Sequence, residues 1–257
     1  ILLGLGDDDH TQYHNDTRGD ARYSQLGHTH TKSQITDLTN IREALSADRT
    51  YYVRTDGSNS NTGLVDSSGG AFLTIQKAIN TVATLDIGTF SVTIQVRDGT
   101  YTGGASVTSP WLGSGTVFLL GNNTTPANVV ISTSGVSVTV VNNGTLNVSG
   151  FKLTSSAGSC LYANNGGAIT INTVGAGSKM NFGTAAAFHL LSENGGSILL
   201  TSNYEVTGGA FAHVGAFTVG VMRIIGQTIT LTGTPVFSGI FVNIARNGIT
   251  EFYSNTF

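Results

Sequence analysis

A glycine that follows a polar turn and precedes a short strand-like run recurs through the second half of the chain. The five occurrences are Gly144, Gly167, Gly196, Gly220 and Gly248. Their intervals are 23, 29, 24 and 28 residues. A unit of this length cannot bury both faces of its strands alone, whereas stacked units can. The recurrence therefore predicts a parallel β-solenoid, and an antiparallel β-sandwich is the alternative.

Asparagine accompanies the glycine in four of the five turns. These residues are Asn143, Asn165, Asn194 and Asn247. Asparagine tolerates left-handed backbone, and stacked asparagine side chains can hydrogen-bond to one another. We therefore expect an asparagine ladder along the turns.

Charge divides the chain into parts. Eight of the 15 acidic residues precede residue 50, and none lies between Gly99 and Ser192. This distribution predicts an N-terminal arm over 1–49, a transition over 50–105 and a β-rich body over 106–257, which we expect to continue into further chain. A net charge of −3 gives no basic footprint for nucleic acid, and no apolar run is long enough for a membrane helix. The single cysteine, Cys160, is predicted to be a small buried apolar residue.

The end of the arm carries a helical pattern. Ile35, Leu38, Ile41 and Leu45 are spaced by three, three and four residues, with coiled-coil character. So short a helix is marginal alone, which favours packing against copies of itself. A single amphipathic turn lying on the body is the alternative.

The transition region shows two periods. Apolar residues recur at helical spacing after Thr74, the expected N-cap, and predict a helix over about 74–85. From Phe90 to Arg97 the pattern alternates strictly, which predicts a half-buried strand that ends at the Asp98–Gly99 turn.

Several stretches resemble tail-fibre and tailspike proteins of bacteriophages and phage-derived particles. They are GLGDDDHTQYHNDTRGDARY, GHTHTKSQITDL, and YYVRTDGSNSNTG with the following GGAFLTIQKAINTV and VTIQVRDGTYTG, within about residues 4–105. The last two are also similar to the start of right-handed parallel β-helices of the pectate-lyase type. There, an amphipathic helix, here about Thr74–Leu85, caps the N-terminal end and protects an exposed sheet edge.

The resemblance implies a homotrimeric virion protein assembled in the bacterial host cytoplasm. Residues 1–49 would join it to tail, baseplate or neck proteins. The body would contact host surface polysaccharide, with no nucleic acid partner and no membrane span. A secreted bacterial β-helix adhesin unconnected with phage is a further alternative.

Two histidines in the arm are candidate metal ligands. His28 and His30 form a His-x-His pair, which extended backbone places on one side of the strand. Resemblance to certain phage fibre tips implies one ion on the threefold axis of a trimer. Six imidazoles would give octahedral coordination, suited to Fe(II) or another divalent transition metal. Solvated loop histidines are the alternative. His10 and His14 with Asp7–Asp9 are a second candidate.

Catalysis on a polysaccharide would need convergent side chains. Hydrolysis uses two carboxyl groups about 5–10 Å apart, for which Glu193 and Glu205 are the candidates, and Glu251 is the remaining carboxylate of the body. Lyase chemistry would use a base and a cation, for which the candidates are Tyr204, His213 and Arg223. Because no convergent cluster is evident, we expect a protein that binds a glycan without cleaving it. A capsule or lipopolysaccharide depolymerase is the alternative.

Overall fold

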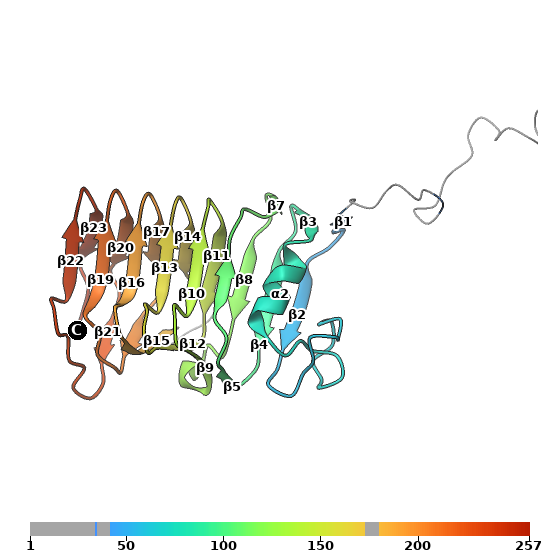
Figure 1. The fold of residues 1–257 in the computed structure, drawn as a ribbon, viewed down its shortest axis with the longest axis horizontal. Coiled ribbons are helices and arrows are strands. Elements are labelled where there is room, and N and C mark those ends of the chain that lie inside the picture. Colours follow the sequence, from blue (N-terminus) through green and yellow to red (C-terminus); the bar gives the residue numbers. More distant parts are fainter. Residues whose placement is uncertain (1–33, 35–41, 173–179) are drawn as a thin grey trace, which may run out of the picture. The chain divides into compact units, whose positions relative to one another are not determined.

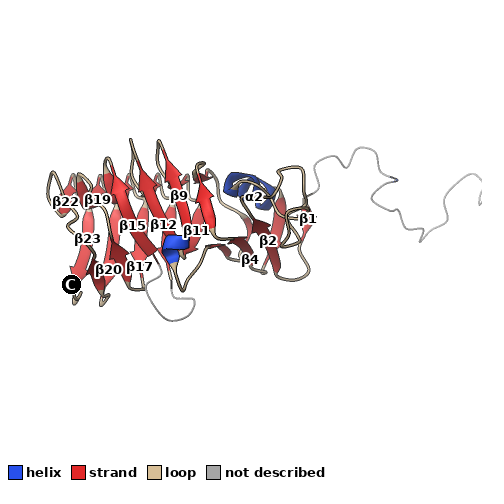
Figure 2. Cartoon of the chain, turned by 90° about the horizontal axis from the view of Figure 1, so that it is seen from below, coloured by secondary structure: helices blue, strands red, loops and turns tan. Residues whose placement is uncertain are grey.

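The structure is a computed structural model that describes Gln34, residues 42–172 and residues 180–257. Contacts divide the chain into two units, Ile1–Ile41 and Arg42–Phe257, and the fold described below is that of the second. Its strands lie side by side in a row that follows the sequence from blue to red in Figure 1, and Figure 2 shows how few helices accompany them. The unit is an all-β structure of parallel sheets.

Three large sheets and one small sheet make up this unit. Sheet I contains β22 (Val242–Ala245), β19 (Ala212–Phe217), β16 (Phe188–Glu193), β13 (Leu161–Asn164), β10 (Val138–Val141) and β6 (Ala105–Val107). Sheet II contains β2 (Arg49–Val53), β4 (Val92–Val96), β8 (Val117–Leu120), β11 (Thr145–Ser149), β14 (Ala168–Ile171), β17 (Ser197–Leu200), β20 (Val221–Ile225) and β23 (Ile249–Tyr253). Sheet III contains β21 (Ile229–Leu231), β18 (Tyr204–Val206), β15 (Met180–Ala185), β12 (Phe151–Ser155), β9 (Val129–Thr133) and β5 (Gly99–Tyr101). The small sheet contains β1 (Glu43–Ala44), β3 (Leu85–Gly88) and β7 (Leu112–Gly113).

From β10 onward the chain passes through sheets I, II and III in a fixed order, and we call each passage a repeat. Each strand pairs with the equivalent strand of the next repeat, so that Val138 aligns with Leu161 and Leu161 aligns with Leu190. Every strand pairing recorded in the described ranges is parallel, in all four sheets. The antiparallel sandwich is therefore wrong.

The core consists of side chains that stack in columns along the row of strands. One column of sheet II contains Val117, Leu146, Ile169, Ile198 and Met222, each at most 1% exposed. In sheet II, strands such as β4 and β8 alternate between buried and partly exposed residues, as the period of two requires. Burial of each large apolar side chain contributes roughly 1.5–3 kcal/mol, so the stacked columns stabilise repeats that could not fold singly.

The turn between sheets I and II is the repeating glycine motif, and the strand register aligns its five copies. The first turn position has positive φ at Asn142, Asn165, Asn194, Thr218 and Arg246. The second has positive φ at Asn143, Gly166, Gly195, Val219 and Asn247. The third position is always the glycine found in the sequence. At Gly196 an added Cβ would lie 2.3 Å from the carbonyl oxygen of Ala163, so only glycine fits there.

The asparagine ladder differs in membership from the prediction. The left-handed backbone is confirmed at all four residues, but two of them occupy the first turn position and two the second. Asn165 Nδ2 donates to Asn142 Oδ1 at 2.6 Å, and Asn194 Nδ2 donates to Asn164 Oδ1 at 3.0 Å. The ladder therefore includes asparagines outside the predicted set.

The predicted helix and strand of the transition region are confirmed. Helix α2 (Ile75–Val82) begins at the N-cap Thr74, whose side chain accepts a hydrogen bond from the Lys77 amide. Its buried face packs against β2, β4 and β6. Strand β4 alternates between buried and partly exposed residues. A 3₁₀ helix, η2 (Pro126–Asn128), lies near β12. The described helices include none long and apolar enough to cross a membrane.

The helix predicted to extend to Leu45 is wrong at its C-terminal end. Glu43–Ala44 forms β1, which pairs with β3, and the Leu45 amide donates to the Asp86 carbonyl at 2.9 Å. Leu45 is 7% exposed and packs into the core of its own chain. Sheet pairing satisfies the backbone there while burying the leucine, which a helical stripe directed at another chain would not do. The remaining stripe residues lie outside the described residues.

Candidate functional site

The outer face of sheet I carries a cluster of large apolar side chains, which we call the aromatic patch. Its members are Phe188, Leu191, Phe211 and Phe217. The ring centroids of Phe188 and Phe211 are 5.7 Å apart, and those of Phe188 and Phe217 are 5.6 Å apart, both in edge-to-face geometry. Phe211 is 42% exposed, and the other three are partly exposed. A ring cluster on an outer sheet face has the chemistry that an apolar or amphipathic ligand requires.

Two glycines let the rings lie close to the backbone. A Cβ added to Gly215, in the middle of β19, would meet the Phe188 ring at 2.8 Å and Leu191 Cδ1 at 3.0 Å. A Cβ added to Gly239 would meet the Phe211 ring at 2.9 Å. The patch therefore depends on the absence of side chains at these two positions.

A polar network borders the aromatic patch. Glu193 aligns with Phe217 in the β16–β19 register. The Tyr162 hydroxyl donates to Glu193 Oε2 at 3.0 Å and accepts a hydrogen bond from Asn164 Nδ2. Burial first, and then the bond to Glu193, raise the pKa of Tyr162. Aromatic faces beside a carboxylate, a phenol and amides suit a ligand that has both apolar ring faces and many hydroxyl groups.

The other two candidate carboxylates lie on different sheets. Glu205, on β18 of sheet III, accepts from Asn181 Nδ2 at 2.7 Å and from the Thr232 hydroxyl. Glu251, on β23 of sheet II, pairs with Arg223 Nε at 3.1 Å. Glu193 is on sheet I. Each carboxylate is thus engaged by side chains of neighbouring repeats, and Glu193 and Glu205 come from different sheets rather than from one face.

The candidate lyase residues do not form an accessible site. Tyr204 and His213 do meet, with the hydroxyl 2.8 Å from His213 Nε2, but both side chains are 0% exposed. A polysaccharide could not reach them in this structure. Arg223 is exposed on sheet II, where it is paired with Glu251.

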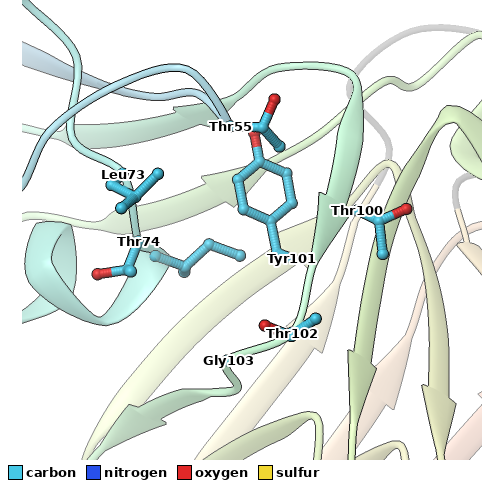
Figure 3. A pocket seen from close by; sticks show the side chains of 8 residues that line it. Thr55, Leu73, Thr74, Thr100, Tyr101, Thr102 and Gly103 are labelled. Carbon is cyan, nitrogen blue, oxygen red and sulfur yellow. The ribbon is translucent and has the colours of Figure 1, made fainter.

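Two pockets that share Thr55 were not predicted. Figure 3 shows the first, of about 240 Å³, in which Tyr101 and Leu73 lie among the hydroxyl groups of threonines. The second, of about 550 Å³, shares Thr55 with it and is lined by charged side chains, among them Arg54 and Arg97. These charges pair with one another: Arg54 Nε lies 2.8 Å from Asp56, and Arg97 pairs with Asp66. The hydrogen bond from Arg97 contributes most to lowering the pKa of Asp66. The remaining charge of this pocket, Asp98, accepts hydrogen bonds from Asn122 Nδ2 and Asn128 Nδ2, both at 3.0 Å.

The metal candidates cannot be placed. His10, His14, His28, His30 and Asp7–Asp9 all lie outside the described residues. Within residues 42–172 and 180–257, no group of three or more His, Cys, Asp or Glu side chains is arranged to hold a metal ion. Cys160 is 0% exposed, as predicted for a buried apolar residue, and burial raises its pKa.

The chain was compared with protein-family models, curated proteins and solved structures, and none matched. The aromatic patch therefore stands on its geometry alone. Its signal in the sequence was a glycine at an outward position of a strand, within Ala212–Phe217, with phenylalanines nearby. That signal becomes readable only once the register places Phe188 beside β19.

Proposed function

We propose that this chain is a virion structural protein, a trimeric tail fibre or spike that contacts host-cell surface glycans during adsorption. Its body would be a right-handed parallel β-helix with α2 as the N-terminal cap. Residues 1–49 would attach it to the particle. The glycan contact would be the aromatic patch with its polar border at Glu193 and Tyr162.

The repeating passage through three parallel sheets supports the β-helix. Each passage supplies one strand to each sheet, and the same turn recurs between sheets I and II. Such a stack is stiff, and its outer faces repeat at the strand spacing of about 4.8 Å. A stiff rod with a regular lateral face suits attachment at a distance from the particle.

The aromatic patch is the observation that carries the glycan proposal. Pyranose rings present apolar faces that pack on aromatic side chains, while their hydroxyl groups need hydrogen-bond partners at the rim. Phe211 and Phe217 offer the aromatic side chains. The hydrogen-bond partners at the rim are Glu193, Tyr162 and Asn164.

The distribution of the carboxylates supports binding without cleavage. Glycoside hydrolysis needs two carboxyl groups on either side of one bond. Glu193, Glu205 and Glu251 lie on three different sheets and are individually hydrogen-bonded or ion-paired. The proposal therefore assigns Glu193 a binding role.

Binding of the purified chain to immobilised capsule and lipopolysaccharide from candidate hosts tests the proposal. The aromatic substitution Phe211→Ala should weaken binding at least about fivefold, because a partly exposed aromatic contact is worth roughly 1 kcal/mol or more. The matched control is Leu199→Ala, which removes a 36% exposed apolar side chain from sheet II. Equal loss in both variants, or no binding to any surface glycan, would contradict the proposal.

Release of reducing ends or unsaturated uronates from the same glycans would establish the depolymerase alternative instead. Light scattering coupled to size exclusion tests the assembly, for which we expect the mass of a trimer. A monomer at micromolar concentration, from a chain that retains residues 1–49, would rule the trimer out.

A further inference from the structure

Two histidines lie in the core directly behind the aromatic patch. His189 follows Phe188 on β16, and His213 lies on β19, and both are 0% exposed. Their Nδ1 atoms are 2.9 Å apart, and His213 Nε2 is 2.8 Å from the Tyr204 hydroxyl. His189 Nε2 is buried and makes no hydrogen bond to a side chain among the described residues. The other buried polar side chains of the described residues are serines and Asn181, so the two histidines are the buried polar residues that can take up a charge.

The surroundings of the pair are aromatic and uncharged. Ring centroids of Phe182 and Phe237 lie 5.8 and 5.7 Å from that of His189, and Phe241 lies 4.8 Å from His213. The titratable group in contact with the pair is the Tyr204 phenol from β18, and the Cys160 thiol, which precedes β13, is buried in the same core and donates to the Leu153 carbonyl. Burial raises the pKa of both, so both are neutral at physiological pH.

The same burial disfavours the charged imidazoles. It lowers the pKa of His189 to about 4, although the backbone of Gly183 and Gly209 opposes part of this effect. It lowers the pKa of His213 well below 6.5, with a further contribution from His189. In the described part of the chain, no carboxylate contributes to either shift.

The network can hold neutral imidazoles and one added proton, but not two. Each ring nitrogen of a neutral imidazole either donates or accepts. In one arrangement Tyr204 donates to His213, and His213 Nδ1–H donates to His189. One added proton reverses the chain: His189 Nδ1–H then donates to His213, and His213 Nε2–H donates to the Tyr204 oxygen. A second proton would set two N–H groups and two positive charges face to face at 2.9 Å.

We propose that His189 and His213 form an acid-sensitive latch that keeps β16 and β19 packed at neutral pH and opens this part of the core on acidification. Because Phe188 and Phe217 lie on the same two strands, opening would dismantle the aromatic patch. The acid-sensitive latch is inferred from the buried histidine pair alone. Only the expected release of a glycan rests on the proposed function.

The direction of the pH dependence follows from the lowered pKa values. A histidine with a folded pKa below 6.5 contributes stability that is fully present above pH 6.5 and is lost as the pH falls toward the folded value, here about 4 for His189. Each imidazole that must charge on opening favours opening by about tenfold per pH unit within that window.

Hydrogen–deuterium exchange of the full chain at pH 7 and pH 4.5, corrected for intrinsic rates, tests the latch. We expect protection of β16 and β19 to fall by about a hundredfold or more, while β4 and β8, several repeats away, change much less. Equal changes in all four strands, or no change in β16 and β19, would overturn the proposal. This readout needs no ligand, so its failure is distinct from a failure of glycan binding.

Two variants with opposite expectations sharpen the test. Replacing both histidines (His189→Leu with His213→Leu) should abolish the acid-dependent loss of protection. Tyr204→Phe keeps both imidazoles and removes the acceptor of the reversed chain, so opening should begin at higher pH. If the double variant fails to fold, the Tyr204→Phe shift alone decides: a shift to lower pH, or none, contradicts the latch.

The matched control replaces the other four histidines, His10, His14, His28 and His30, by glutamine. Retention of the acid response in this control is expected. Its disappearance would assign the response to the arm and overturn the proposal. Glycan release measured at the same two pH values would then tell whether the latch acts on binding.

Discussion

The Tyr162 hydroxyl donates a hydrogen bond to Glu193 Oε2 across 3.0 Å, from one repeat to the next on the outer face of sheet I. The register also places Glu193 beside Phe217 of the following repeat. One carboxylate thus connects a polar network on β13 with the aromatic patch on β19. This position makes Glu193 the most informative single residue for distinguishing binding from catalysis.

Replacing Glu193 by glutamine should weaken glycan binding about tenfold, because hydrogen bonds to a charged group contribute about 1.5–3 kcal/mol. The shape of the side chain is kept, so the fold should be unaffected. Isothermal titration or surface plasmon resonance with the glycan identified by screening measures the change. Glu251→Gln, on sheet II, is the control and should bind normally. If the unmodified chain cleaves the glycan and the Glu193→Gln variant does not, Glu193 is catalytic.

Substituting Gly196 by alanine should destabilise the fold by about 1–3 kcal/mol, since the new Cβ would lie 2.3 Å from the Ala163 carbonyl oxygen. Urea unfolding followed by circular dichroism gives the free energy. Gly135→Ala is the control: nothing lies within 4 Å of its added Cβ, and it should be neutral or slightly stabilising. Equal effects at the two positions would mean that the close backbone approach at the turn is absent.

Val219 should be a site of stabilisation. It is a β-branched residue with φ of 57° at the second turn position, where other repeats have asparagine or glycine. Val219→Asn should raise the free energy of unfolding by about 1 kcal/mol, because the strain of a left-handed β-branched residue is relieved. Val236→Asn, at an exposed position without positive φ, should change it by less than about 0.5 kcal/mol. Thermal melting of both variants and the unmodified chain measures the change in stability. An equal change in the two variants would contradict the expected relief of backbone strain at Val219.

The proposed metal site in the arm predicts about one transition-metal ion for three chains. Elemental analysis of the purified protein should find it at neutral pH. Replacing His28 and His30 by alanine should remove it, and so should acidification below about pH 6.5, because the ligands must be neutral imidazoles. The β-sheet signal in circular dichroism should remain in both cases. A metal-free protein that still forms trimers would leave these histidines without a structural role.

Local sequence signals were sufficient for the elements that depend on short-range chemistry. Strand β4 follows from strict alternation, α2 from its apolar spacing and the Thr74 cap, and the turn glycines from their recurrence. The register confirms that the five glycines are structurally equivalent. Leu45 shows where such signals fail: its spacing fits a helix, but pairing of β1 with β3 places it in the core.

The repeat can be read from the order of the amino acids: five glycine turns at intervals of 23 to 29 residues predict stacked strands. Each turn needs left-handed backbone and a close approach that few residues allow. Which side chains of successive repeats meet depends on how the folded sheets align. The intervals between the turn glycines vary because the connections between sheets differ in length. Residue spacing alone therefore does not predict which side chains of successive repeats are in contact. The packing of Phe188 over Gly215 is a contact between the neighbouring strands β16 and β19. His189 and His213, which are 24 residues apart in the sequence, meet across the same two strands. Both contacts arise from the register of β16 and β19.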